Sequence, residues 1–318
     1  VIKFIIRFYE LGGVSVGEFK RDLYKRKHDR QLGIEQLQKM QEMPWFKLLK
    51  EDVERGEVFP ALRYSGEIDF YYRGALLCKY KGNLKGEPTT SRNKGPFNPE
   101  NRDDYKKIKE SCEEWGKKAS GEANERATLS VLYSKFSPYI KPAPSMILLD
   151  IEVGFPKLFL SDEENHRNTQ VDLLFLDKST GKLYFIEVKE AGDGRVKVES
   201  AGRSVEKIFD SMPVMEQLDE YDANLAARED QILAAYQNYF SITREIFGCE
   251  IYSGKLSLYN RTKLLVYGES NTNNSRKSLE AIHTKLGNDL IVFENGLDLV
   301  DDLPERIISG SFCRSRNS

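Results

Sequence analysis

The sequence predicts an α/β fold in which helices flank a mixed sheet on both faces. Two observations support this prediction. Apolar, strand-like runs occur at 146–153, 170–176, 182–189 and 263–267, and stretches with helical spacing precede the first run and follow the third. The resulting order is helix, three strands, helix, strand, and 40% hydrophobic residues in a chain of 318 suffice for a sizeable core.

The first hundred residues, 1–100, are expected to form an accessory α+β region that binds nucleic acid or a partner. Residues 14–49 have a mainly helical pattern, and six of the eleven residues in 20–30 are basic. Such a basic run is typical both of a phosphate-binding surface and of a solvated helix face. Residues 59–80 have strand character, and 81–98 are rich in Gly, Pro, Asn, Thr and Lys, which predicts a loop or linker.

The stretch from 103 to 136 is charged and has helical spacing. Residues three or four apart share one face of a helix, and five residues fall at these intervals: Glu122, Glu125, Leu129, Leu132 and Phe136. The apolar members must face a core, and the glutamates lie on the same face of the helix, about one turn away. The pattern leaves two readings open, a glutamate that serves a site and a solvated glutamate favoured by the helix dipole.

Three charged residues interrupt two apolar strands that are joined by a turn at 177–181. Asp172 opens the first strand, and Glu187 and Lys189 close the second. Residues two apart on a strand share a face, so Glu187 and Lys189 project together, and the hairpin can bring Asp172 beside them. Two carboxylates beside an ammonium form a candidate site for a divalent cation. The alternative is a surface ion pair, which contributes little to stability.

This arrangement resembles the PD-(D/E)xK nuclease superfamily. The signature of that superfamily is an acid at a strand start, a variable hairpin, and acid-x-Lys at the end of the next strand. Asp172, Glu187 and Lys189 are similar to these three residues, whereas Gln170 and Val171 stand where the family name places proline. The resemblance covers about half the chain and implies a restriction-endonuclease-like αβββαβ core at 101–275.

The resemblance also implies a metal site and the roles of its residues. Asp172 and Glu187 would bind Mg²⁺ or Mn²⁺ directly, with the backbone carbonyl of Val188 as a third ligand. Glu125, in preference to the competing Glu122, would bind a second ion or hold water at the site. Lys189 would orient or polarise the attacking water and stabilise the phosphate.

A further helix is expected to begin near Pro213, because proline suits the first turn of a helix. Gln217 and Tyr221 lie four residues apart on one face of it. This pair resembles the QxxxY element of RecB-type members, which implies that Gln217 and Tyr221 help to position the substrate. The histidine-bearing helix of that group is not matched, since no histidine occurs between His28 and His166.

Basic residues follow the second strand of the hairpin and are the preferred substrate contacts. A turn at 192–195 includes Arg195 and is followed by Lys197, Arg203 and Lys207. The net charge of the whole chain is only −2, so nucleic-acid binding must depend on such local groups. Beyond the core, 276–318 is expected to form an extension with a helix at 278–286, a strand at 290–293 and a flexible tail.

Other chemistries are poorly supported by the sequence. The four cysteines include no CxxC pair, the three histidines include no HExxH, and no phosphate-cradling P-loop occurs. Scattered cysteines suit a reducing compartment, which favours a cytoplasmic location. The apolar start of the chain is too short to span a membrane.

Together these features predict a metal-dependent nuclease that acts on DNA, with RNA as an alternative substrate. By analogy, chains of this design serve in restriction, phage defence or repair. The competing hypothesis is a non-catalytic nucleic-acid-binding or assembly module with the same fold, and the intact Asp172, Glu187 and Lys189 favour the enzyme. Cleavage specificity, endo- or exonuclease action, a homo-oligomer and a partner protein are left open.

Overall fold

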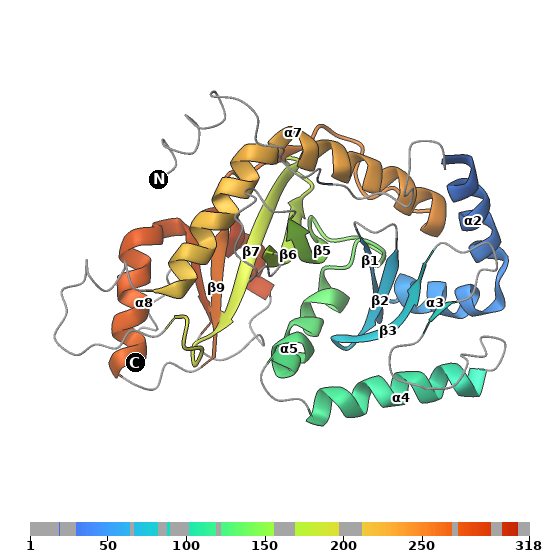
Figure 1. The fold of residues 1–318 in the computed structure, drawn as a ribbon, viewed down its shortest axis with the longest axis horizontal. Coiled ribbons are helices and arrows are strands. Elements are labelled where there is room, and N and C mark those ends of the chain that lie inside the picture. Colours follow the sequence, from blue (N-terminus) through green and yellow to red (C-terminus); the bar gives the residue numbers. More distant parts are fainter. Residues whose placement is uncertain are drawn as a thin grey trace, which may run out of the picture.

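A computed structural model of the chain describes residue 19 and the ranges 30–63, 67–81, 88–89, 102–118, 122–155, 169–196, 212–268, 273–293 and 301–310. Within these ranges the chain forms two β sheets with helices packed around them (Figure 1). No helix in this part of the chain is both long and apolar enough to cross a membrane.

The N-terminal region forms a four-stranded antiparallel sheet beside two helices. Its elements are α2 (Arg30–Glu42), α3 (Pro44–Glu54), β1 (Val58–Leu62), β2 (Ile68–Tyr72), β3 (Ala75–Tyr80) and β4 (Pro88–Thr89). Strands that follow one another in sequence pair with one another, in the order β1-β2-β3-β4. The helices followed by strands that the sequence predicts are therefore present, and most of the expected loop at 81–98 lies outside the described residues.

The charged stretch at 103–136 contains two helices, α4 (Arg102–Lys118) and α5 (Glu122–Lys135). α4 packs on the N-terminal region, where Tyr105 Oη and Lys109 Nζ both donate to the buried carboxylate of Asp52, at 2.7 and 2.9 Å. α5 lies between the two sheets (Figure 1). The Tyr133 ring contacts Phe59 of β1, and Phe136, directly after the helix, contacts Phe175 of the second sheet.

The second sheet is mixed and has six strands, which matches the predicted α/β class. They are β5 (Met146–Phe155), β6 (Thr169–Asp177), β7 (Lys182–Glu190), β8 (Ser257–Leu258), β9 (Lys263–Tyr267) and β10 (Leu290–Phe293). The order is β10-β9-β7-β6-β5, with β8 paired to β7. β5, β6 and β7 are antiparallel neighbours, whereas β9 runs parallel to both β7 and β10.

The β6–β7 turn is fixed by its own side chains. Asp177 accepts hydrogen bonds from the backbone N–H of Ser179 (2.9 Å) and from Thr180 Oγ1 (2.7 Å). Gly181 adopts φ +70°, and a Cβ there would lie 2.3 Å from the carbonyl oxygen of Lys255. Glycine is therefore required at this position, and the turn sets the register that brings the far ends of β6 and β7 together.

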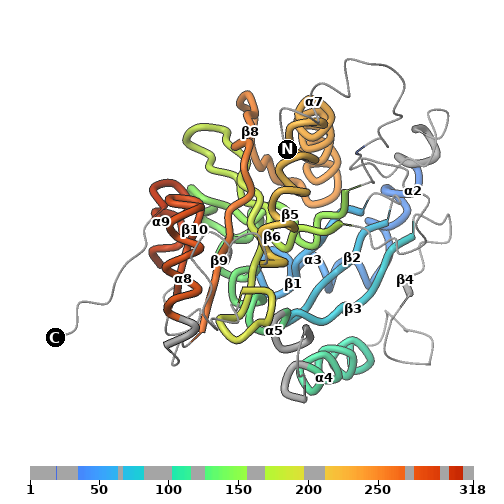
Figure 2. The backbone as a smooth tube through the Cα atoms, turned by 60° about the vertical axis from the view of Figure 1, so that its left-hand side comes forward, coloured from blue at the N-terminus to red at the C-terminus, as the bar shows by residue number. Residues whose placement is uncertain are grey.

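The long helix α7 (Pro213–Phe247) connects the second sheet with the N-terminal region (Figure 1). Its N-terminal half lies along the second sheet, and its C-terminal end reaches α2, where Gln41 Nε2 donates to the carbonyls of Glu245 and Ile246. Non-helical backbone angles at Arg228 mark a kink between the halves. Figure 2 shows α8 (Asn273–Leu286) and α9 (Leu303–Ser309) beside β10.

Helices cover both faces of the second sheet, as the sequence predicts. Leu174, Leu176 and Phe185 belong to the core that includes the buried face of α7. Their neighbours Leu173, Phe175 and Ile186 belong to a second core with α5 and α9. Alternate residues of β6 and β7 thus point into different cores, which explains why these strands are apolar on both faces.

Candidate active site

Asp172 lies at the point where the pairing of β6 with β7 ends. The last backbone pair before it joins Leu173 to Ile186. Beyond this pair, Asp172 Oδ2 accepts a hydrogen bond from the backbone N–H of Val188 at 2.7 Å. The half-buried carboxylate is therefore fixed against the end of β7 rather than extended into solvent.

Glu187 and Lys189 are buried charges on β7, with relative exposures of 1% and 2%. Lys189 Nζ donates to Glu187 Oε1 and to the carbonyl oxygen of Val188, the latter at 2.9 Å. The same ammonium lies 3.9 Å from Asp172 Oδ2. Removing a charge from water is expensive, and the Lys189 ammonium is tolerated because two acidic side chains are within reach.

α7 contributes Gln217 and Tyr221 to the same cluster. Gln217 Nε2 donates to Glu187 Oε1 at 2.9 Å and lies 2.5 Å from Tyr221 Oη. Tyr221 Oη in turn donates to the carbonyl oxygen of Gln170 at the start of β6. The polar face of α7 is thereby tied to both strands that carry the acids, and five residues that the sequence predicts for the site lie together.

The electrostatics of the two acids are unusual. Burial, together with the nearby charge of Asp172, raises the pKa of Glu187 to about 8, in spite of the opposing effect of Lys189. Burial also raises the pKa of Asp172, against the attraction of Lys189. The single ammonium therefore does not compensate both carboxylates, and additional positive charge would stabilise the ionised pair.

The donor set fits a hard divalent cation. Glu187 Oε2 is buried and has no hydrogen-bond partner among the described residues. Mg²⁺ takes oxygen ligands and keeps several waters, so two carboxylates and the carbonyl of Val188 suffice. A group of three or more acidic, histidine or cysteine residues placed to hold a metal does not occur in the described part of the chain. The side chains of Glu122 and Glu125, in the first turn of α5, lie outside it.

These residues line a cavity of about 350 Å³ between α5 and α7. Its wall also includes Arg126 and Tyr133 of α5, Glu152 of β5 and Glu220 of α7. Glu152 and Arg126 were missed by sequence reasoning. Glu152 carries the same signal as Asp172, a charge within an apolar strand run, whereas nothing in the sequence distinguishes Arg126 from other exposed arginines.

Among the predicted substrate contacts, Arg195 lines this cavity. Its guanidinium is held by the Asp193 carboxylate through Nε and Nη2, at distances between 2.6 and 3.1 Å. Lys197, Arg203 and Lys207 lie outside the residues that the structure describes. Among the described residues, Arg195, in the turn that follows β7, is thus the predicted basic contact that lies at the site.

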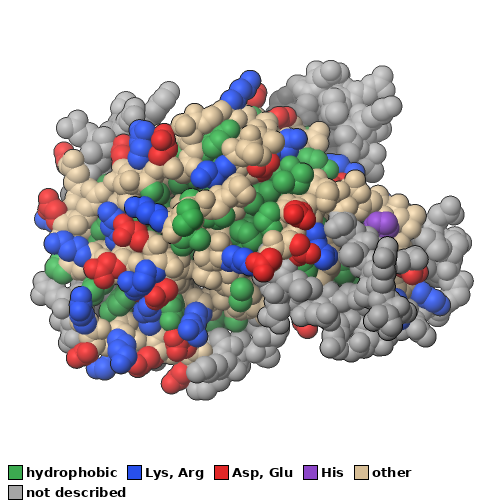
Figure 3. Space-filling view, turned by 180° about the vertical axis from the view of Figure 1, so that it is seen from behind, with side chains coloured by type: hydrophobic (Ala, Val, Ile, Leu, Met, Phe, Trp, Pro, Cys, Tyr) green, Lys and Arg blue, Asp and Glu red, His purple; other side chains and the backbone are tan. Residues whose placement is uncertain are grey.

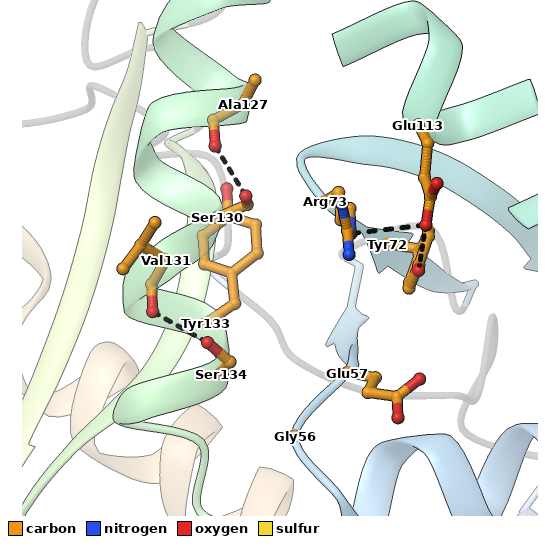
Figure 4. A pocket seen from close by; sticks show the side chains of 10 residues that line it. All are labelled: Gly56, Glu57, Tyr72, Arg73, Glu113, Ala127, Ser130, Val131, Tyr133 and Ser134. Atoms are coloured by element: carbon orange, nitrogen blue, oxygen red, sulfur yellow. Dashed lines mark hydrogen bonds and ion pairs between the residues drawn. The ribbon is translucent and has the colours of Figure 1, made fainter. Parts of the chain in front are cut away.

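A larger cavity of about 670 Å³ lies between α5 and the β2–β3 turn (Figure 4). Tyr133 borders both cavities. Several polar side chains that line the larger cavity already have partners. Ser130 and Ser134 donate to carbonyls of α5, and Tyr72 Oη donates to Glu113 at 2.8 Å. The smaller cavity is the better candidate because it contains the buried acids and Lys189.

The surface carries charges of both signs, so a charged ligand would be attracted by local groups rather than by the net charge of the chain. On the face shown in Figure 3, basic and acidic side chains are interspersed, in agreement with the net charge of −2. Comparison of the chain with protein-family models, with curated proteins and with solved structures finds no match in any of the three.

Proposed function

We propose that this chain is a metal-dependent nuclease that hydrolyses phosphodiester bonds in DNA. The observation that supports the proposal best is the convergence of Asp172, Glu187 and Lys189 at one end of the β6–β7 hairpin, inside a cavity. Buried acids with raised pKa values beside a lysine are characteristic of catalytic centres. The order α5, β5, β6, β7, α7, β9, with the two-residue β8 inserted before β9, supports the further proposal of a restriction-endonuclease-like core.

Asp172 and Glu187 would hold Mg²⁺ or Mn²⁺ together with the carbonyl of Val188. Such a cation lowers the pKa of an attacking water and neutralises charge that develops on the phosphate. Glu187 presents Oε2, which has no hydrogen-bond partner among the residues that the structure describes, while Gln217 and Lys189 fix its other oxygen. The acids are thus oriented before substrate arrives.

Lys189 supplies a positive charge close to both acids. Because the ammonium lies close to both Asp172 and Glu187, it can stabilise negative charge on the phosphate without a large rearrangement. Exclusion of water strengthens this interaction relative to solution. Tyr221 acts indirectly, through Gln217. Its hydroxyl group connects α7 to β6 and keeps Gln217 beside Glu187.

The test is cleavage of supercoiled plasmid and of labelled single-stranded DNA, duplex DNA and RNA, with Mg²⁺ or Mn²⁺ compared against EDTA. We expect metal-dependent cutting by the wild type. Rates should fall roughly 10²–10³-fold in Asp172→Ala and Lys189→Ala, because each removes one electrostatic group at the centre. Asp219→Asn is the matched control, since Asp219 is exposed on α7 and does not line the cavity.

Circular dichroism of each variant separates loss of chemistry from loss of folding. A folded wild type that binds DNA and cuts nothing with either metal would contradict the proposal and favour a non-catalytic binding module. Cutting by Asp172→Ala at the wild-type rate would remove the assigned site. Preferential cutting of RNA would retain the site and change the substrate.

A further inference from the structure

The backbone of Glu152 is held in an unusual conformation beside the site. Glu152 has φ +50°, a left-handed angle that is uncommon for residues other than glycine. It stands between Ile151, which pairs with Leu173, and Val153, which pairs with Val171, and therefore lies across from Asp172. Such a conformation persists only where the surroundings determine it, and residues of this kind concentrate at functional sites.

The N-terminal region supplies the group that holds Glu152. Arg63, which follows β1, donates through Nη1 to the carbonyl oxygens of Ile151 (2.6 Å) and Glu152 (3.3 Å). Through Nη2 it contacts the Glu152 carboxylate at 3.3 Å, and Tyr71 Oη donates to the same oxygen, Oε2, at 2.9 Å. One side of the Glu152 carboxylate is therefore fixed by two side chains from the N-terminal region.

Arg63 is itself rigidly placed. Its Nε donates to Asp69 Oδ2 at 3.0 Å, and its Nη1 lies 3.9 Å from the buried Asp150. Asp150 accepts a hydrogen bond from Tyr236 of α7 at 2.9 Å. The arrangement around Glu152 thus has supports from the N-terminal sheet, from β5 and from α7, and little freedom remains for its carboxylate.

The other carboxylate oxygen of Glu152 is directed to Arg126. Arg126 Nη2 lies 2.9 Å from Glu152 Oε1, while 47% of the Arg126 side chain stays exposed. The backbone of Arg126 is also fixed, because Gly74 of the β2–β3 turn packs against it so closely that a Cβ would lie 2.3 Å from its carbonyl oxygen. The guanidinium is thus held at the cavity wall by Glu152, while about half of the side chain stays exposed.

The balance of charges in the cavity wall indicates what Arg126 can bind. Four carboxylates line it, those of Glu152, Asp172, Glu187 and Glu220, and three basic side chains, those of Arg126, Lys189 and Arg195. Lys189 lies beside the two central acids, where the bond would be cleaved, so a neighbouring phosphate of the same strand needs positive charge from the rim. An arginine held by a carboxylate through one nitrogen can use its remaining donors in a planar, bidentate contact with phosphate.

We infer that Arg126 binds a backbone phosphate of the nucleic acid next to the cleaved bond, and that Glu152 is its positioning residue. This inference rests on the nuclease function proposed above. It makes the N-terminal sheet part of the binding site, because Arg63 and Tyr71 act on the substrate through Glu152 and Arg126.

The test measures binding of a short fluorescent DNA duplex in EDTA over a range of salt concentrations, and steady-state cleavage with Mg²⁺. For Arg126→Gln we expect the slope of log K against log salt to fall by about 0.9, the loss of one phosphate contact. KM should rise roughly tenfold with little change in kcat, independent of sequence. Arg126→Lys should restore most of the slope and part of the affinity, because lysine keeps the charge without the fork.

Arg261→Gln is the matched control. Arg261 is 49% exposed and pairs with Asp289 at 2.9 Å, but it does not line the cavity. This variant should keep the wild-type slope and KM. The role of Glu152 is tested by Glu152→Gln, which should lower the slope in the wild-type background and leave it unchanged in the Arg126→Gln background, a result that a purely structural role would not give.

The outcomes separate this inference from the nuclease proposal. If the wild type cuts DNA and Arg126→Gln has the slope and KM of Arg261→Gln, the role of Arg126 is overturned and the nuclease proposal stands. If the wild type neither binds nor cuts nucleic acid, the proposed function fails and this inference fails with it.

Discussion

At the residue scale, Glu187 is the group whose environment has the clearest measurable consequence. Its pKa is raised from an ordinary value of 4.5 to about 8 by burial and by Asp172. The folded, metal-free protein therefore retains a proton that the unfolded chain releases near pH 4.5. The stability that this proton contributes is fully present below pH 4.5 and is lost as the pH rises through 8.

Replacing Glu187 by Gln should remove this pH dependence. In EDTA, the unfolding free energy of the wild type relative to Glu187→Gln should decrease by a few kcal/mol between pH 4.5 and 8, since each pKa unit corresponds to about 1.4 kcal/mol. Urea denaturation across this range measures it. Glu190→Gln, an exposed position on the same strand, is the control. Parallel curves for wild type and Glu187→Gln would show that Glu187 is not protonated in the folded state.

The same residues show what a single sequence can reveal. Asp172, Glu187 and Lys189 were predictable, because charges in strands that are apolar on both faces require a reason. Glu152 carries the same signal at 146–153, but the apolar residues that surround it predict only a strand. The contact of Arg63 with Glu152 joins positions 89 residues apart and leaves no trace in local patterns.

At the element scale, periodicity and turn chemistry predict most of the second sheet. The strand at 263–267 and the strand at 290–293 occur as β9 and β10. The short β8 and α9 were not predicted, because two residues or two helical turns give too little periodicity to recognise. The predicted extension at 276–318 contributes β10, so the sheet contains a strand from beyond the expected core.

The packing of α5 on the β2–β3 turn depends on the absence of a side chain at Gly74. Gly74 has φ +77°, and a Cβ there would meet the carbonyl of Arg126. Gly74→Ala should therefore destabilise the fold by more than about 1 kcal/mol and should weaken DNA binding by displacing Arg126. Gly192→Ala is the control, because nothing lies within 4 Å of its Cβ position. Chemical denaturation and binding of labelled DNA measure both effects, and equal behaviour of the two variants would contradict this account.

At the scale of the whole molecule, the N-terminal region and the second sheet share one continuous core. Trp45, Phe46 and Leu49 of α3 belong to the same buried cluster as Tyr236 and Phe247 of α7. Arg63 adds a polar connection at the site, and Gln41 adds another at the end of α7. The sequence suggested an accessory region at 1–100, but a composition change along the chain cannot show how closely two regions pack.

This shared core predicts that the two regions unfold together, and the chain provides a probe for each. Its two tryptophans, Trp45 and Trp115, both lie in the N-terminal half, in α3 and α4, whereas circular dichroism reports chiefly on all helices, including the long α7. Tryptophan fluorescence and circular dichroism should therefore give coincident denaturation curves. Arg63→Met should lower the unfolding free energy by about 3–5 kcal/mol and shift both curves together to lower denaturant, because it deprives the buried Asp69 and Asp150 and the half-buried Glu152 of their shared cation. A fluorescence transition that separates from the circular dichroism transition, or an Arg63→Met variant that shifts only one of them, would show that the N-terminal region is an independent unit and that its contacts with the site are incidental.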